Sequence, residues 1–136
     1  MCHDIPLTNH GISHDAGSDH RKTDGRGNVC HLDGNGRFHR LDGPAVEWSN
    51  GTKMWYRHGN LHREGGPAVE WPDGSLWWYR HGKLHREDGP AYEGANRASR
   101  AWYREGKLHR EDGPAVERPD GGKEWYREGR LLREGE

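Results

Sequence analysis

The sequence is poor in the aliphatic residues that fill an ordinary protein core. Leu, Ile, Val and Phe together account for 16 of 136 residues, a fraction typical of disordered chains. A disordered chain also has few aromatic residues and a high net charge, whereas this one has 7 Trp, 5 Tyr and a formal net charge of −1. The composition, with its 21 glycines, therefore excludes a thick aliphatic core and indicates a thin, turn-rich fold stabilised by aromatic side chains.

Other scarcities exclude further classes of protein. Two cysteines, Cys2 and Cys30, are too few for a disulfide framework, which favours a reducing compartment, the cytoplasm. No run approaches the ~18 apolar residues of a membrane-spanning helix, and residues 1–20 lack a basic segment followed by an apolar one, so we expect neither a membrane span nor a secretory signal. Because 21 basic residues nearly balance 22 acidic ones, a nucleic-acid partner is not expected.

A repeat of 23 residues is the strongest signal in the sequence. Trp-Tyr pairs begin at positions 55, 78, 102 and 125, Gly-Pro pairs at 43, 66, 89 and 113, and His-Arg pairs at 39, 62, 85 and 109. Three markers in one phase are typical of an array in which each unit packs on its neighbours. We expect residues 30–136 to form this array, with a degenerate first unit and a truncated last one, and residues 1–29 to form an irregular or loosely packed arm.

Each unit contains the signals of two strands and two turns. Asn50-Gly51, Asp73-Gly74 and Asp120-Gly121 favour two-residue hairpin turns. Such turns would pair Val46 with Trp55 and would place the Trp and Tyr of each pair on opposite faces. The third unit has a loop that is one residue longer, at residues 94–99. The sequence therefore predicts an all-β fold, an antiparallel, single-layer, elongated sheet of eight to ten strands built from ~23-residue β-hairpin repeats.

The segment from Trp78 to Gly89, followed by Pro90-Ala91, resembles the MORN repeat. It is more similar to the bacterial variant of that repeat, which has Tyr-Tyr-x-x-Gly-Lys-Leu. The resemblance covers roughly residues 30–136 and implies a sheet of hairpins that serves as a scaffold, a partner-binding module or a lipid-surface module. Bacterial relatives are often described as antitoxin-like. The family's Gly-x-Gly is replaced here by Asp-Gly-Pro-Ala, and His-Arg-Glu-Asp-Gly is particular to this chain.

The repeated histidines have a structural interpretation and a metal-binding alternative. Equivalent histidines ~10 Å apart cannot share one ion, so we interpret them as turn residues that hydrogen-bond to the following Glu-Asp-Gly. The alternative is an ion held within one turn, by His58 with His62 or by His81 with His85. The N-terminal region also has several zinc-binding residue types but no paired motif: Cys2, His3, His10, His14, His20, Cys30 and His31. We expect no metal and no cofactor.

The same repetition argues against an enzyme, because a catalytic site is normally built once, in a pocket. Three tryptophans instead predict a contact surface. Trp48 and Trp71 share a repeat position that holds Gly94 and Arg118 in later units, which indicates a solvent-facing site. Together with Trp77, Arg57 and Arg80 they form our first candidate binding surface, because Trp and Arg are enriched at binding hot spots.

The second candidate surface is the turn edge with His62, Arg63, His85 and Arg86. We therefore predict a non-enzymatic protein-interaction module with a protein partner, by family resemblance a small bacterial or phage-encoded inhibitor or antitoxin-like binder. The alternative is a module that binds a small ligand, a lipid headgroup or a glycan.

Overall fold

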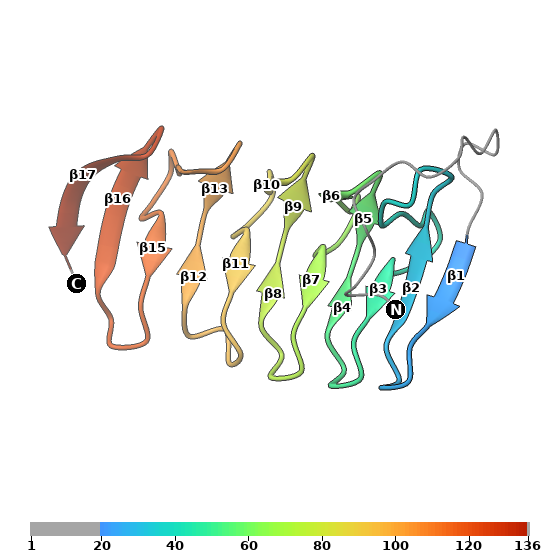
Figure 1. Ribbon diagram of the computed structural model, residues 1–136. Coiled ribbons are helices and arrows are strands. Elements are labelled where there is room, and N and C mark those ends of the chain that lie inside the picture. The colour runs from blue at the N-terminus through green and yellow to red at the C-terminus, as the bar shows by residue number, and fades with distance from the viewer. Residues whose placement is uncertain (1–19, 136) are drawn as a thin grey trace.

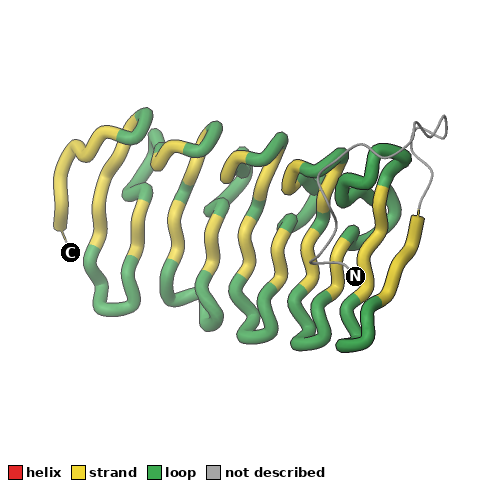
Figure 2. The backbone as a smooth tube through the Cα atoms, viewed as in Figure 1, coloured by secondary structure: helices red, strands yellow, loops and turns green. Residues whose placement is uncertain are grey.

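The computed structural model describes residues 20–135, which form β-strands and the turns between them. An open antiparallel sheet of 11 strands extends along the whole molecule (Figures 1 and 2). Its strands, in spatial order, are β1 (His20–Thr23), β2 (Val29–Leu32), β3 (Val46–Glu47), β4 (Lys53–Met54), β7 (Val69–Glu70), β8 (Leu76–Trp77), β11 (Tyr92–Glu93), β12 (Arg100–Ala101), β15 (Val116–Glu117), β16 (Lys123–Arg127) and β17 (Arg130–Gly135). The expected elongated all-β sheet is confirmed, although it has more strands than the eight to ten expected.

Three small hairpins extend this sheet along one long edge. They are β5–β6 (Tyr56–Arg57 and Asn60–Leu61), β9–β10 (Tyr79–Arg80 and Lys83–Leu84) and β13–β14 (Tyr103–Arg104 and Lys107–Leu108). Their two-residue turns have positive φ at both positions, 46° at His58 and 86° at Gly59 in the first, as a type I′ turn requires. Successive hairpins are joined by backbone hydrogen bonds, such as the 2.8 Å bond that Gly82 donates to the carbonyl of Leu61.

The turns at the opposite edge shift the strand register by one residue from the expected one. Val46 pairs with Met54, not with Trp55, and Val69 pairs with Trp77. The cause is a three-residue loop, closed by the 2.9 Å bond from the Trp48 N–H to the Thr52 carbonyl and ending on Gly51 with φ of 99°. This is a type I turn followed by a left-handed residue, so the predicted two-residue turn is wrong. The longer loop of the third unit is confirmed, because Gly94 there bonds to Ser99.

The sheet begins before the predicted boundary at residue 30. Strand β1 pairs with β2, with His20 opposite Leu32, so residues 20–29 belong to the sheet and not to an irregular arm. The Asp24 carboxylate holds the connecting turn by accepting hydrogen bonds from the N–H groups of Arg26 and Asn28, at 2.9 and 3.1 Å. The remainder of the predicted arm, residues 1–19, lies outside the described residues.

The core is thin, as the composition predicts. Cys30, Leu32 and Val46 form a buried cluster, against which Phe38, Trp48, Met54 and Tyr56 pack. In the other units the fully buried side chains are small, namely Ala68, Ala91 and Ala115. Since such small side chains bury little apolar area, contacts between neighbouring units must supply much of the stability. Residues 20–135 contain no helix that is long and apolar enough to span a membrane.

Candidate interaction surface

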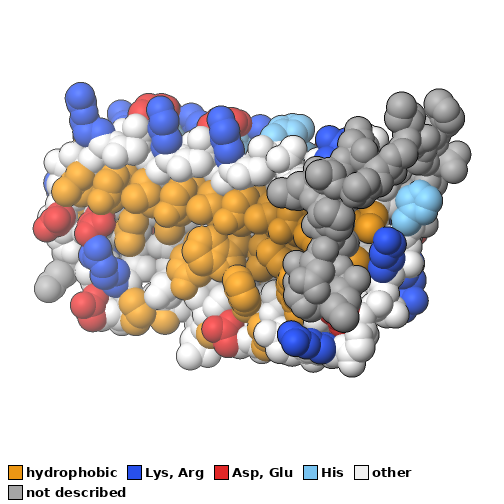
Figure 3. All heavy atoms as spheres, in the orientation of Figure 1, with side chains coloured by type: hydrophobic (Ala, Val, Ile, Leu, Met, Phe, Trp, Pro, Cys, Tyr) orange, Lys and Arg blue, Asp and Glu red, His pale blue; other side chains and the backbone are white. Residues whose placement is uncertain are grey.

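The strand register assigns the side chains to two chemically different faces, because alternate residues of a strand point to opposite sides. One row across the strands is apolar, and Figure 3 shows this side as a continuous band of hydrophobic side chains. From β2 to β15 the row consists of Cys30, Val46, Met54, Val69, Trp77, Tyr92, Ala101 and Val116, and in β16 it continues to Glu124. The adjacent row points the other way and is mostly charged: Glu47, Lys53, Glu70, Leu76, Glu93, Arg100, Glu117 and Lys123. We call these the apolar face and the polar face.

A ladder of stacked tryptophan and arginine side chains occupies the polar face. Its guanidinium groups lie 3.8–4.0 Å from the indole centroids, in the pairs Arg63–Trp55, Arg86–Trp78, Arg110–Trp102 and Arg133–Trp125. Nη1 of Arg63 also donates to the Pro67 carbonyl and to the Glu70 carboxylate, at 3.0 Å each. Stacking on indole faces adds to these bonds. Arg63 and Arg86, expected as contact residues, are therefore part of the fold.

The repeated histidines link neighbouring hairpins. They are buried, and each Nδ1 accepts a 3.0 Å hydrogen bond from a backbone N–H of the next hairpin turn, in the pairs His39–His58, His62–His81, His85–Glu105 and His109–Glu128. An accepting Nδ1 requires a neutral ring with its proton on Nε2. Burial lowers the pKa of His39 and His62 and so favours this neutral form. The histidines therefore contact the next unit through Nδ1, while Nε2 of His62, His85 and His109 lies 3.6 Å from the glutamate of the following Glu-Asp-Gly or Glu-Gly segment, where the contact was expected.

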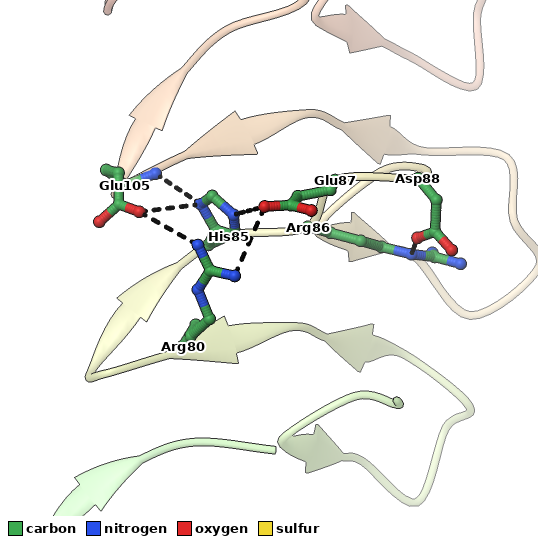
Figure 4. A network of polar contacts seen from close by, with 6 residues as sticks. All are labelled: Arg80, His85, Arg86, Glu87, Asp88 and Glu105. Atoms are coloured by element: carbon green, nitrogen blue, oxygen red, sulfur yellow. Dashed lines mark hydrogen bonds and ion pairs between the residues drawn. The ribbon is translucent and has the colours of Figure 1, made fainter. Parts of the chain in front are cut away.

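The exposed charges beside each histidine are already paired. Around His85, Nε2 lies 3.6 Å from Glu87 and Nδ1 lies 3.5 Å from Glu105, and Arg80 approaches both carboxylates at 3.5 Å (Figure 4). Arg57 lies 3.8 Å from Glu64 in the preceding unit. The four predicted contact residues Arg57, Arg80, His62 and His85 therefore interact mainly with the protein's own carboxylates and backbone.

Histidine rings meet between units and not within one turn. His58 stacks on His39 with a centroid distance of 4.0 Å, and His81 lies 4.7 Å from His62. The metal-binding alternative expected contacts within one turn, between His58 and His62 and between His81 and His85. The observed ring contacts are instead those between units. Within residues 20–135, no group of three or more His, Cys, Asp or Glu side chains is arranged to hold a metal ion. Cys2, His3, His10 and His14 lie outside the described residues.

Open grooves separate the successive His-Arg-Glu-Asp-Gly loops. One groove of about 970 Å³ is lined by residues that include Arg80, Glu87, Arg104 and Glu111. Similar hollows of about 480 and 380 Å³ recur in the preceding units. Their walls combine ionised side chains that already form pairs with aromatic rings such as Trp102 and Tyr103.

The three tryptophans of the first candidate surface lie on the apolar face, but they differ in burial. Trp71 is 43% exposed. Trp48, at the same repeat position, is half-buried against the cluster around Val46, and its Nε1 lies 3.2 Å from the sulfur of Met54. Trp77 is half-buried against Tyr92, with ring centroids 4.5 Å apart. The first candidate surface thus combined tryptophans of the apolar face with Arg57 and Arg80, which point to the opposite face. The structure does not bring these two groups together.

Sequence reasoning missed the most regular feature of the apolar face. Tyrosine and leucine face each other across every small hairpin and its counterpart in β16–β17, in the pairs Tyr56–Leu61, Tyr79–Leu84, Tyr103–Leu108 and Tyr126–Leu131. We call these eight residues the apolar stripe. Burial raises the pKa of Tyr56, Tyr79 and Tyr103, so these phenols keep their protons. The available signal was the leucine that follows each tyrosine by five residues, with a turn glycine between them.

Comparison with known proteins yields no relative. A scan of protein-family models and a search of curated proteins find no match to this chain. Within residues 20–135 the two faces of the sheet differ in chemistry: the polar face is covered by paired charges, whereas the apolar face repeats half-buried tyrosine and leucine side chains.

Proposed function

We propose that this protein is a non-enzymatic interaction module that binds another protein through the apolar stripe and the neighbouring tryptophans Trp71 and Trp77. The observation that carries the proposal is the continuous band of hydrophobic side chains on one face of an open sheet (Figure 3). Extended apolar patches are rare on soluble monomers and commonly mark sites of association. Among residues 20–135, no strand or hairpin forms a second layer over this band.

The composition of the stripe supports a protein partner. Aromatic residues are enriched at the centres of protein interfaces, where they contribute large areas with few rotatable bonds. A rigid sheet also loses little conformational freedom on binding. The resemblance to MORN repeats agrees with a binding role. The alternative, a small-ligand site, receives less support because the charged side chains in the grooves, such as Arg80 with Glu87 and Arg104 with Glu111, are already paired with one another.

Site-specific photo-crosslinking in cells of the source organism tests the proposal. Benzoyl-phenylalanine would replace Tyr79 or Tyr103 in the stripe, and in control proteins Lys53 or Arg100 on the polar face. An aromatic replacement of tyrosine preserves the half-buried ring, so the fold should persist, and circular dichroism would verify this. We expect mass spectrometry to identify one and the same protein crosslinked from both stripe positions.

Binding to the purified, identified protein provides the decisive comparison. Tyr103→Glu should abolish binding, because it places a carboxylate in the apolar stripe, whereas Asn96→Glu in the exposed loop of the same unit should not. If Tyr103→Glu unfolds the chain, Tyr103→Ala replaces it. Crosslinks that come equally from Lys53 and Arg100, or an unchanged affinity of the stripe variants, would overturn the proposal.

A further inference from the structure

The apolar stripe has a regular repeat distance that selects among possible partners. Strands β5, β6 and β9 lie in succession along the edge, because Gly82 of the second hairpin bonds to Leu61 of the first. Tyrosine and leucine therefore alternate along the stripe, with two strands per unit. At ~4.8 Å between strands, equivalent tyrosines are ~9.6 Å apart.

A row of basic side chains follows the same period at the turn edge of these hairpins, in register with Arg80, Arg104 and Arg127, and borders the stripe from that edge. Lys83, Lys107 and Arg130 are exposed and each directly follows a turn glycine; we call them the basic row. Figure 3 shows Lys and Arg side chains at intervals along the edge of the hydrophobic band where these hairpins lie. Arg80 and Arg104 of the same hairpins pair with Glu87 and Glu111, but within residues 20–135 the basic row forms no ion pair.

Three kinds of linear partner can be compared with this spacing. Seven residues of an α-helix advance ~10.5 Å, and two residues of an extended strand advance ~6.8 Å. Three residues of a polyproline II helix advance ~9.3 Å, which is closest to the ~9.6 Å of one unit. Across three units the mismatch is only ~1 Å for polyproline II but ~3 Å for the α-helix.

We propose that the apolar stripe and the basic row bind an acidic segment in the polyproline II conformation, with a proline or other apolar residue and an acidic residue in each group of three. This inference rests on the proposed function and names the partner's chemistry. The apolar residue of each triplet lies between successive tyrosines, and its acidic residue faces Lys83, Lys107 or Arg130. Aromatic surfaces bind such segments because the ligand helix is already extended before binding.

Polar groups of the stripe complement this ligand as well. A polyproline II segment makes no internal hydrogen bonds, so its carbonyl groups accept bonds from outside. The phenols of Tyr79 and Tyr103 are protonated, since burial raises their pKa, and can donate to those carbonyls. An anionic membrane would use the same charges, but the stripe tyrosines are half-buried beside their neighbours and do not project as side chains that insert into lipid do.

Fluorescence anisotropy with a labelled (Pro-Pro-Glu)5 peptide tests the inference on the full chain. We expect saturable binding that weakens as salt is added, and no binding of (Pro-Pro-Lys)5. Lys83→Ala combined with Lys107→Ala should weaken binding about five- to tenfold, as expected for two exposed charge pairs. The control combines Lys53→Ala with Lys123→Ala, which also removes two positive charges but from the polar face. This control should leave the affinity for the peptide unchanged.

Three outcomes would overturn the inference. These are equal binding of both charge variants, equal or tighter binding of an acidic heptad-repeat helix, and binding to phosphatidylserine vesicles without binding to the peptide. The photo-crosslinking experiment is independent of this result. Stripe-dependent capture of a protein together with failure of the peptide would reject the polyproline partner and keep the interaction module, whereas failure of both would reject both.

Discussion

Single buried histidines hold adjacent units of this protein together. Because His85 accepts a hydrogen bond from the Glu105 N–H at 3.0 Å, its replacement removes a contact between units as well as a buried ring. His85→Ala should lower the free energy of unfolding by about 2–4 kcal/mol, measured by urea denaturation. His85→Asn, whose amide oxygen can accept the same bond, should recover part of this loss. Asn96→Ala, at an exposed loop position, should change stability by less than about 0.5 kcal/mol, and an equal cost at both sites would contradict the linking role.

Acid should destabilise the protein through these histidines. Burial lowers the pKa of His39 and His62 below the ordinary value of 6.5. The stability that these neutral histidines contribute is therefore complete above pH 6.5. It is lost as the pH falls from 6.5 to their lower pKa values in the folded state, because the unfolded chain binds protons first. His62 also faces the cationic Arg57, the titratable His81 and the opposing carboxylate of Glu64. Tm measured between pH 8 and pH 5 should fall below pH 6.5, and His62→Asn should reduce that slope; a Tm that rises with acid would contradict this.

Trp48 and Trp71 share one repeat position but should respond differently to truncation. Trp71→Ala removes a side chain that is 43% exposed, so the free energy of unfolding should change by less than about 0.5 kcal/mol. Trp48→Ala opens a space beside the buried cluster of Cys30, Leu32 and Val46 and should cost about 2 kcal/mol. Thermal denaturation of both variants measures the difference. Equal Tm values would contradict the assigned burial.

At the scale of the structural element, the glycines of three Gly-Pro pairs, Gly66, Gly89 and Gly113, make room for the tryptophan–arginine ladder. An added Cβ at Gly66 would lie 2.9 Å from the guanidinium carbon of Arg63, too close for the arginine to remain on Trp55. Gly66→Ala should therefore cost about 1–3 kcal/mol, measured by urea denaturation. Gly25→Ala is the matched control, since nothing lies within 4 Å of its added Cβ. A cost at Gly25 as large as that at Gly66 would show that chain flexibility, and not the ladder, is responsible.

The hairpins show how far the sequence predicts this fold. Period, strand content and sheet architecture follow from the spacing of Trp-Tyr and Gly-Pro, because a repeated unit repeats its turns. Register does not follow, since Asn50-Gly51 suits either a two-residue turn or the last two residues of a three-residue loop. The Asn50 side chain accepts a 2.9 Å bond from the Thr52 N–H within the observed loop. A one-residue shift of this kind changes the cross-strand partner of every residue in the hairpin.

The candidate site could be predicted only in part, because the face to which a side chain points depends on the register. Trp48, Trp71 and Trp77 were identified from composition and repeat position, and all three lie on the apolar face. The structural role of Arg63 and Arg86 could not be predicted, because an arginine in a turn segment has the same sequence signature whether it is solvated or stacked on an indole. Only the fold places Arg86 3.9 Å from the Trp78 ring and 3.0 Å from Glu93.

At the scale of the whole molecule, the two faces of the open sheet differ in role: one stabilises the array and we propose that the other binds a partner. On the polar face the tryptophan–arginine ladder stabilises each unit and the histidine links join neighbouring units, so these side chains are used internally. The apolar face repeats tyrosine and leucine without a described layer above it (Figure 3). A one-dimensional array of this kind presents equivalent groups at constant spacing, which suits an extended partner better than a compact one.

Hydroxyl-radical footprinting of the protein, free and bound to the crosslinked partner, tests the central claim most directly. It reports the solvent accessibility of tyrosine and tryptophan side chains on both faces in one experiment. We predict that Tyr79, Tyr103 and Trp77 become protected on binding, whereas Trp78 and Trp102 of the polar face keep the same reactivity. Protection of Trp78 and Trp102 with unchanged Tyr79 and Tyr103 would contradict the assignment of the apolar face as the contact surface.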